Sequence, residues 1–211
     1  MGSPSEDPKL TVARGYDQIA RGYRSRRQPP STGRKRAYLD RLTNGLKHDA
    51  AILDLGCGAG VPVASYLSER FSVIGVDISR GQLALARTSV PKAAFILADM
   101  CSLALKPASF DAIVAMYSII HVPREEHEAI LLRLFDCLRP GGRLLAVLGA
   151  RSWEGTEANW LDLGAEMYWS HFDADTGIAM LERIGFHLLS SAVEPDPLNG
   201  AHLFVLAEKP V

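Results

Sequence analysis

Three glycines at alternate positions follow an apolar run that carries an acid near its end. The acid is Asp54, and the turn after it is Gly56-x-Gly58-x-Gly60. A short apolar run of this kind is typical of a buried parallel strand. The glycines let a ligand approach the backbone with no Cβ in the way, and Pro62 suits the first turn of a helix. Strand, turn and helix N-terminus together predict a nucleotide-binding cradle.

Two further acids end the next apolar runs. Asp77 comes 17 residues after Gly60, and Asp99 ends the run after that, followed by Met100. A carboxylate at the end of the second strand can accept two hydrogen bonds from a ribose diol. Asp99 can accept from an adenine amino group, with the Met100 thioether against the ring. Because the carboxyl ends of parallel strands meet at one crevice, the three segments predict a site for an adenosine.

The glycine spacing separates this site from a dinucleotide site. The dinucleotide fingerprint is Gly-x-Gly-x-x-Gly. Here the third glycine, Gly60, comes one position early, and Val61 stands where the fingerprint has glycine. The turn therefore departs from the pyrophosphate pattern and does not favour hydride transfer from a nicotinamide.

Strands and helices alternate from residue 51 onward. The expected strands are 51–55, 72–77, 93–97, 110–116, 142–148, 186–193 and 202–208, and the expected helices between them are 61–69, 79–88, 124–138 and 173–184. Such alternation predicts a parallel sheet covered by helices on both faces. Two more helices, 10–25 and 32–46, precede the first strand. We expect a disordered tail over residues 1–8 and a single domain over 9–211.

Composition narrows the class of protein. The chain has 211 residues, 47% of them hydrophobic, and a formal net charge of −1. This size suits one domain with a full core. The charge provides no general case for binding nucleic acid or membrane, and no run approaches the roughly 20 apolar residues of a membrane span. The N-terminal residues lack a signal-peptide pattern, so we expect a cytoplasmic protein. The three cysteines match no zinc or disulfide framework and are expected to be free thiols.

Five motifs in order resemble those of the class I S-adenosylmethionine-dependent methyltransferases. They are Asp54–Gly60, Val73–Ser79, Ala98–Met100, Phe110–His121 and Leu138–Leu144. The resemblance covers about residues 10–208. It implies an α/β, Rossmann-like, seven-stranded sheet whose last strand is antiparallel, reached by a hairpin turn at 194–200. It also implies S-adenosylmethionine as cofactor.

The resemblance extends to the N-terminal helix. Tyr16 and Tyr23 lie in a pattern similar to the lid helix of small-molecule methyltransferases, whose aromatic residues close over the cofactor, so residues 9–47 are expected to be lid helices. With the core motifs, the expected cofactor-binding residues are Tyr16, Tyr23, Asp54, Gly56, Cys57, Gly58, Gly60, Asp77, Ile78, Asp99, Met100 and Met116.

Two histidines are candidate catalytic groups. A phenol or alcohol acceptor benefits from a base, whereas a carboxylate or free amine needs none. His121 follows the fourth strand, where the family places residues near the substrate, and a capping or core histidine is an equally good interpretation. His171 lies beside an aromatic segment and is a candidate substrate contact.

That segment, residues 150–172, interrupts the alternation and holds all three tryptophans. Long connections are often functional, and aromatic residues gather where ligands are buried. We expect it to cap the substrate. The alternative is a surface helix whose aromatics pack on the sheet. The expected substrate-binding residues are Tyr117, Trp153, Trp160, Tyr168 and Trp169.

Charge is unevenly distributed. Residues 9–47 hold eleven Lys and Arg against two acids, while 151–202 hold nine acids against two arginines. Solvated helix faces explain this most simply; the alternatives are attraction of an anionic substrate or of nucleic acid. The sequence lacks the carboxylate cluster of metal-dependent catechol-type enzymes, so no metal is expected.

The motifs thus favour a monomeric or homodimeric methyltransferase acting on oxygen or nitrogen of a small molecule, with nucleic acid and membrane unlikely as partners. An RNA or protein methyltransferase and a non-catalytic cofactor-binding scaffold remain alternatives.

Overall fold

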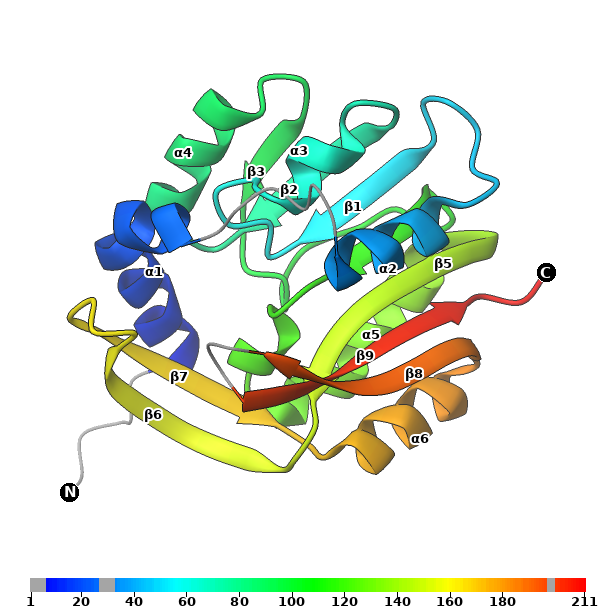
Figure 1. The fold of residues 1–211 in the computed structure, drawn as a ribbon. Coiled ribbons are helices and arrows are strands. Elements are labelled where there is room, and N and C mark those ends of the chain that lie inside the picture. Colours follow the sequence, from blue (N-terminus) through cyan, green and yellow to red (C-terminus); the bar gives the residue numbers. More distant parts are fainter. Residues whose placement is uncertain (1–6, 27–32, 197–199) are drawn as a thin grey trace.

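The computed structural model describes residues 7–26, 33–196 and 200–211 (Figure 1). Its centre is a seven-stranded sheet in the order β3-β2-β1-β4-β5-β9-β8. The strands are β1 (Ala51–Leu55), β2 (Ser72–Asp77), β3 (Ala94–Leu97), β4 (Phe110–Ala115), β5 (Leu138–Gly149), β8 (His187–Asp196) and β9 (Gly200–Glu208). β9 runs antiparallel to both of its neighbours, and β1 to β5 pair in parallel. The predicted sheet with an antiparallel last strand is confirmed.

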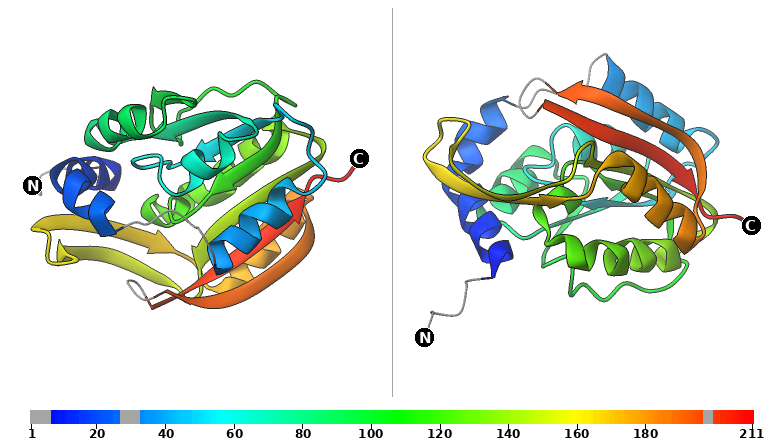
Figure 2. Two further views of the ribbon diagram at one scale, coloured as in Figure 1. Left: turned by 45° about the horizontal axis from the view of Figure 1, so that its top comes forward. Right: turned by 90° about the horizontal axis from the view of Figure 1, so that it is seen from below.

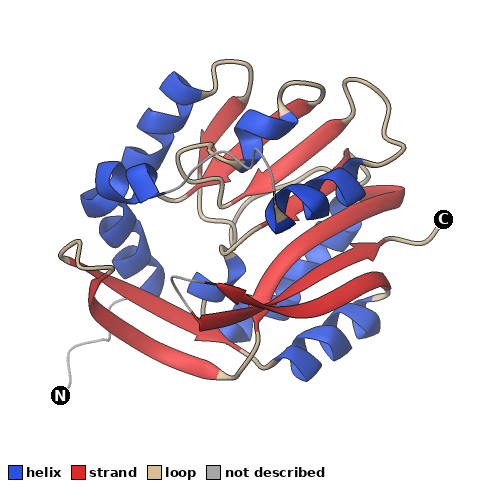
Figure 3. Cartoon of the chain, in the orientation of Figure 1, coloured by secondary structure: helices blue, strands red, loops and turns tan. Residues whose placement is uncertain are grey.

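Helices cover both faces of the sheet (Figure 3). On one face, α2 (Arg34–Thr43) and α3 (Val63–Leu67) pack against alternate residues of β1, β4 and β5. On the other, α5 (His127–Cys137) and α6 (Ala174–Ile184) pack against the intervening residues. β1, β4 and β5 are therefore buried on both sides, which is why these strands read as nearly continuous apolar runs.

Side-chain caps and a left-handed glycine set the boundaries of two helices. Ser79 caps α4 (Arg80–Ser89), and its Oγ accepts from the Gln82 N–H at 3.1 Å. Asp173 caps α6 in the same way through the Thr176 N–H, and Gly185 ends that helix in the left-handed conformation, with φ 114°. These caps satisfy backbone groups that have no partner within the helix.

The start of β5 differs from prediction. The chain enters β5 directly at Leu138, after short turns Ile119–His121 and Arg124–Glu126 and helix α5. Phe110 pairs with Leu138 but Ala112 pairs with Arg143, so the Pro-Gly-Gly segment bulges out of the strand rather than preceding it. A bulge accommodates the residues that the sequence pattern assigned to a separate turn.

The aromatic insertion forms a β-hairpin, so its interpretation as a surface helix is wrong. β6 (Trp153–Trp160) and β7 (Ala165–His171) make a separate two-stranded sheet. Figure 2 shows this hairpin standing off the main sheet, beside the long helix α1 (Pro8–Arg26). α1 begins within the stretch expected to be a tail; residues 1–6 lie outside the described residues, as do 197–199 of the predicted hairpin turn.

Candidate functional site

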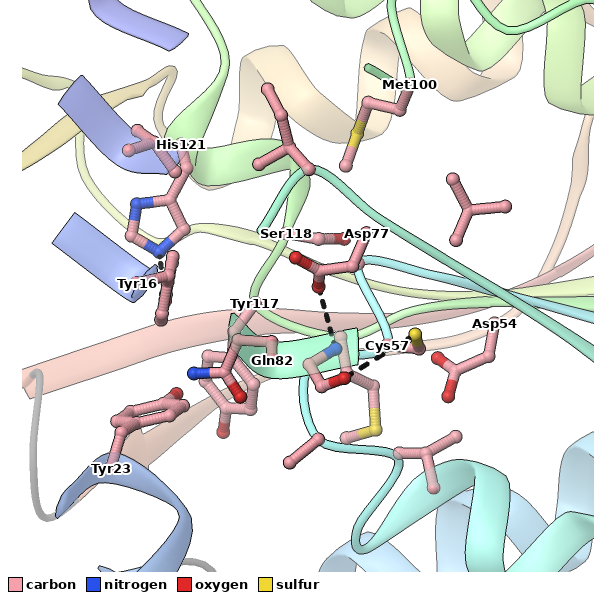
Figure 4. Close-up of a pocket in the computed structure, with 18 of the residues that line it drawn as sticks. Tyr16, Tyr23, Asp54, Cys57, Asp77, Gln82, Met100, Tyr117, Ser118 and His121 are labelled. Atoms are coloured by element: carbon pink, nitrogen blue, oxygen red, sulfur yellow. Dashed lines mark hydrogen bonds between the residues drawn. The ribbon is translucent and has the colours of Figure 1, made fainter. Parts of the chain in front are cut away.

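One pocket lies at the carboxyl ends of the parallel strands, under α1 (Figure 4). Its empty volume, which includes space open to solvent, is about 1110 Å³. Most of the predicted cofactor residues line it: Tyr16, Tyr23, Asp54, Gly56, Cys57, Gly58, Asp77, Ile78, Asp99, Met100 and Met116. Tyr117 and His121 line it too. The adenosine crevice expected from three strand ends is thus assembled from residues far apart in sequence.

The Gly-rich turn depends on close approach at Gly56. Its φ is 75°, and a Cβ there would overlap the Cβ of Ser118. Only glycine fits both constraints without strain. Gly60 lies outside the pocket lining, and a Cβ there would meet the side chains of Val90 and Phe95.

Asp77 is held for hydrogen bonding to a diol. Its Oδ2 accepts from the Gly58 N–H at 2.7 Å and its Oδ1 accepts from the Ser79 N–H at 2.9 Å. Burial raises the pKa of this carboxyl to about 6, although the two N–H groups act in the opposite direction. Ribose hydroxyls would add donors that favour its ionised form.

Asp54 lies deeper and is less satisfied. Burial, together with the nearby Asp77 charge, raises the pKa of the Asp54 carboxyl to about 7. Its Oδ2 is buried with no hydrogen-bond partner among the described residues. A buried acceptor without a donor is costly unless a ligand supplies one. The ammonium and sulfonium charges of S-adenosylmethionine would favour the carboxylate, so this pair of acids fits that cofactor.

Gln82 is a pocket residue that the sequence analysis missed. It is buried, lines the pocket, and has no partner for either side-chain amide atom among the described residues. Its position explains this. It lies in the first turn of α4, and helical side chains point back toward the N-terminus, which here faces the cofactor cradle. The signal in the sequence was its spacing of three from the cap Ser79.

At the adenine end, α1 closes on the third strand. Asp99 Oδ1 accepts from the Cys101 N–H at 2.8 Å, and the Lys9 ammonium lies 3.4 Å from Asp99 Oδ2. Lys9 also donates to Glu126 at 2.8 Å. The start of the lid helix is therefore tied to the acid predicted to bind adenine. Lys9 was recognised in the sequence only as part of a basic segment.

His121 lies in the pocket wall beside the lid. It is 4% exposed, its Nδ1 is 2.8 Å from the Tyr168 carbonyl oxygen, and its Nε2 is 2.9 Å from the Tyr16 hydroxyl. Because a carbonyl can only accept, Nδ1 carries the proton, and Nε2 of the neutral ring accepts from Tyr16. The ring also packs on Trp169 at 4.1 Å between centroids. This arrangement suits a base whose tautomer is fixed by the hydrogen bond from Nδ1 to the Tyr168 carbonyl.

The hairpin supports the pocket but does not line it. Trp160 is 1% exposed and contacts the rings of Tyr16, Tyr23 and His121. Trp169 packs behind His121, and Tyr168 reaches His121 only through its carbonyl while its hydroxyl donates to Glu154. None of the predicted substrate contacts in this segment faces the pocket.

Two predicted site residues lie elsewhere. The Trp153 side chain is largely solvent-exposed, at 46%. His171 lines a separate small cavity next to α6, and its Nδ1 donates to the Arg151 carbonyl at 2.7 Å. Alternation along β7 accounts for part of this, because neighbouring residues of a strand point to opposite faces.

The unequal charge distribution has a structural explanation. Arg34 lies 3.0 Å from Glu194, and Lys35 lies 3.7 Å from Asp196, so the basic start of α2 meets the acidic end of β8. Arg24 and Lys35 also line the pocket. Part of the basic segment is therefore neutralised within the fold, and part faces the ligand site.

Within residues 7–26, 33–196 and 200–211, no group of three or more His, Cys, Asp or Glu is arranged to hold a metal ion, and all three cysteines are free thiols. No helix there is long and apolar enough to cross a membrane.

Comparison with known proteins agrees with this geometry. Residues 52–142 match a family model described as a methyltransferase domain. A curated relative, trans-aconitate 2-methyltransferase from Variovorax paradoxus, is 35% identical over 128 residues, which is 59% of this chain and 48% of that protein. The chain thus spans about half the length of that relative.

Solved structures show the same fold. An S-adenosylmethionine-dependent methyltransferase from Methanosarcina mazei superimposes with a TM-score of 0.71 at 23% identity, covering 81% of this chain and 97% of that one. The [4+2]-cyclase SpnF superimposes with a TM-score of 0.73 at 18% identity, covering 100% and 99%. The ordered motifs, the pocket they form and the match to the methyltransferase domain agree. Residues 52–142 match a methyltransferase domain, and the chain has the fold of S-adenosylmethionine-dependent methyltransferases.

Proposed function

We propose that the protein transfers the methyl group of S-adenosylmethionine to an oxygen or nitrogen of a small-molecule acceptor. The observation that carries the proposal is the pocket itself. Two buried carboxyls, Asp54 and Asp77, have raised pKa values and line the cavity, and Asp54 Oδ2 has no hydrogen-bond donor among the described residues. A cationic cofactor with a ribose diol matches that arrangement.

S-adenosylmethionine supplies a methyl group already activated on a sulfonium, so the protein must align a nucleophile behind it and exclude water. Alignment alone lowers a barrier by roughly 7–11 kcal/mol. α1 closes the pocket through Lys9 and Tyr16. In the displacement, the acceptor's lone pair bonds the methyl carbon as the carbon–sulfur bond breaks and its electrons remain on sulfur.

His121 is proposed as the base for a hydroxyl acceptor. Its Nδ1 is engaged by the Tyr168 carbonyl, and its Nε2 faces Tyr16 at the pocket wall. Because Nε2 accepts from the Tyr16 hydroxyl, that hydroxyl would take the proton that the acceptor oxygen loses as it passes its own proton to Nε2. The catalytic role predicted for His171 loses its support, because that side chain lies in a different cavity.

A small acceptor is favoured over a macromolecule. The relative from Variovorax paradoxus is named for trans-aconitate, a small carboxylic acid. Ion pairs to Glu126, Glu194 and Asp196 occupy several of the basic side chains that nucleic acid would require. An RNA or protein methyltransferase therefore remains the weaker alternative.

The similarity to a cyclase of the same fold supplies a second alternative, since a fold hosts more than one chemistry. Consumption of the cofactor separates the two. We expect S-adenosylhomocysteine to accumulate when the protein meets its acceptor in a panel of small acids, phenols and amines. An Asp77→Ala variant that has lost cofactor affinity is the control. Cofactor binding without turnover across such panels would favour a non-methylating role.

A further inference from the structure

Two lysines line the pocket, on opposite sides of the Gly-rich turn. On one side, Asp54 and Asp77 belong to β1 and β2, and Asp99 follows β3, with the Lys9 ammonium 3.4 Å from its Oδ2. On the other side, the Lys35 ammonium lies against Tyr117, directly after β4, and near Asp196 at the end of β8. In the sheet order β3-β2-β1-β4-β5-β9-β8, the three pocket acids belong to the β1–β3 part, and Lys35 lies toward β4 and β8. Lys35 is therefore the pocket lysine on the side away from the predicted adenosine site.

Among the described residues, two neighbours position Lys35. Its Nζ is 4.6 Å from the centroid of the Tyr117 ring and 3.7 Å from Asp196 Oδ2. Tyr117 donates its hydroxyl to the same Oδ2 at 2.8 Å. Since Asp196 is 7% exposed, its carboxylate orients both side chains within the protein. The Lys35 side chain is 35% exposed, so a ligand in the pocket can approach it.

The backbone of Tyr117 indicates that this arrangement is enforced. Its φ is 58°, a left-handed conformation that costs a residue with a Cβ about 1–2 kcal/mol. Packing fixes the ring, which is 8% exposed and lies edge-on to His202 and Phe204. Backbone strain of this kind persists where the surroundings require one orientation, and it gathers at ligand sites.

We propose that the β4 side of the pocket binds a carboxylate of the acceptor through the Lys35 ammonium, with Tyr117 and Asp196 as positioning residues. This rests on the proposed function, whose acceptor it assigns to a chemical class. An ammonium offers three donors and acts as a point charge. The adjacent Asp196 carboxylate fixes the position of the ammonium.

The test is calorimetric binding to the protein saturated with S-adenosylhomocysteine. The probes are succinate and phenylacetate, each compared with its neutral amide. We expect the carboxylates to bind and the amides to bind at least tenfold more weakly, because a hydrogen bond to a charged group is lost. Lys35→Met should lower carboxylate affinity by about tenfold or more, and Lys35→Arg should retain most of it.

Arg34→Gln is the matched control. Arg34 precedes Lys35 on α2 and pairs with Glu194, yet does not line the pocket. Its replacement by Gln removes one positive charge, as Lys35→Met does. It should leave carboxylate binding within about twofold, in the range of an exposed ion pair. Equal affinity of wild type and Lys35→Met, an equal loss in Arg34→Gln, or failure of every carboxylate to bind would each overturn the proposal.

The two proposals fail in different ways. If S-adenosylhomocysteine itself does not bind, the methyl-transfer function fails. If it binds with the same affinity to wild type and Lys35→Met while the carboxylates do not distinguish them, only the acceptor assignment fails. Thermal melting of both variants establishes that they are folded.

Discussion

At the scale of single residues, the site is dominated by two carboxyls that resist ionisation. Burial raises the pKa of Asp54 to about 7 and that of Asp77 to about 6. Ligand donors and positive charge favour the ionised forms, so cofactor binding must lower both pKa values and release protons. Cofactor affinity therefore depends on pH in a direction that can be worked out.

Affinity for S-adenosylmethionine should rise with pH and level off above about 7. The free protein holds protons below that pH, and they must leave before the ionised site can form. At pH 6 the affinity should be about tenfold weaker than at pH 8, from Asp54 alone. Calorimetry in two buffers of different ionisation enthalpy measures the proton release. Asp54→Asn should reduce that release; a pH-independent affinity in wild type would contradict the account.

The same raised pKa values bear on stability without ligand. Between the ordinary carboxyl pKa of 3.8 and about 7, the folded protein binds more protons at Asp54 than the unfolded chain does. Stability from this residue therefore falls as pH rises through that window. The unfolding free energy of Asp54→Asn minus that of wild type should be larger at pH 8 than at pH 4, as measured by urea denaturation. The opposite trend would refute the assigned pKa direction.

The effect of His121→Gln on kcat should depend on the chemical class of the acceptor. With a hydroxyl acceptor, His121→Gln should lower kcat by about 10²–10⁴-fold, the usual contribution of a positioned base. With a carboxylate nucleophile the loss should stay below about tenfold, because no proton is removed. Cofactor affinity, measured separately, should change little. A loss of equal size for both acceptor classes would indicate a structural role for His121.

At the scale of elements, the hairpin β6–β7 acts behind the site rather than within it. Its inward side carries Trp160 and Trp169, which surround Tyr16 and His121. Its position also depends on Arg124, which bonds Ser170 and Glu154 and so joins the hairpin to the turn after β4. The hairpin therefore determines how the lid tyrosine and the histidine meet.

Two tryptophans of β6 should respond very differently to truncation. Trp160→Ala removes a ring that is 1% exposed and should destabilise the protein by about 3–5 kcal/mol. Trp153→Ala alters an exposed residue and should stay within about 0.5 kcal/mol. Denaturant melts measure both, and wild-type methyl transfer is expected for Trp153→Ala. Similar losses in the two variants would show that the hairpin is packed differently.

The lid helix α1 is tied to the cofactor cradle by Asp17. Its Oδ1 accepts from the Ser79 hydroxyl at 2.6 Å and from the Gly81 N–H at 2.8 Å, at the N-terminus of α4. Asp17→Ala should cost about 0.5–2 kcal/mol of stability, as loss of a helix cap does. It should also speed cofactor release, measured by stopped-flow, because α4 begins next to Asp77.

Asp173→Ala provides the comparison. It removes the side-chain cap of α6, which packs on the other face of the sheet. It should lower the melting temperature but leave cofactor release unchanged. Faster release in both variants would attribute the effect to general loosening rather than to the lid.

At the scale of the whole molecule, the alternation of apolar runs with helical patterns made most of the fold predictable from the sequence. β1 and β2 match their predicted ranges, and the helices predicted over 79–88 and 173–184 are α4 and α6 to within one residue at each end. The hairpin was not predictable from periodicity, because its strands carry exposed polar residues such as Glu154 and because it packs against α1. Two-stranded ribbons are stabilised by what they pack on, which composition does not reveal.

The site divides in the same way. Residues at strand ends were predictable because topology alone brings Asp54, Asp77 and Asp99 together. Lys35 and Gln82 were not, because each reaches the pocket from a helix whose docking depends on tertiary contacts. The acceptor side is built from such residues, so the cofactor could be predicted in more detail than the acceptor.

The central claim is methyl transfer from S-adenosylmethionine to a small carboxylate-bearing molecule, and methyl-labelled cofactor tests it most directly. Protein is incubated with trideuteromethyl S-adenosylmethionine and a complete cell extract, which is then separated into small molecules, RNA and protein for mass spectrometry. We predict that the label appears in a small molecule carrying a carboxylate, and is lost with Asp77→Ala. Label confined to RNA or protein, or none in any fraction despite cofactor binding, would contradict the account.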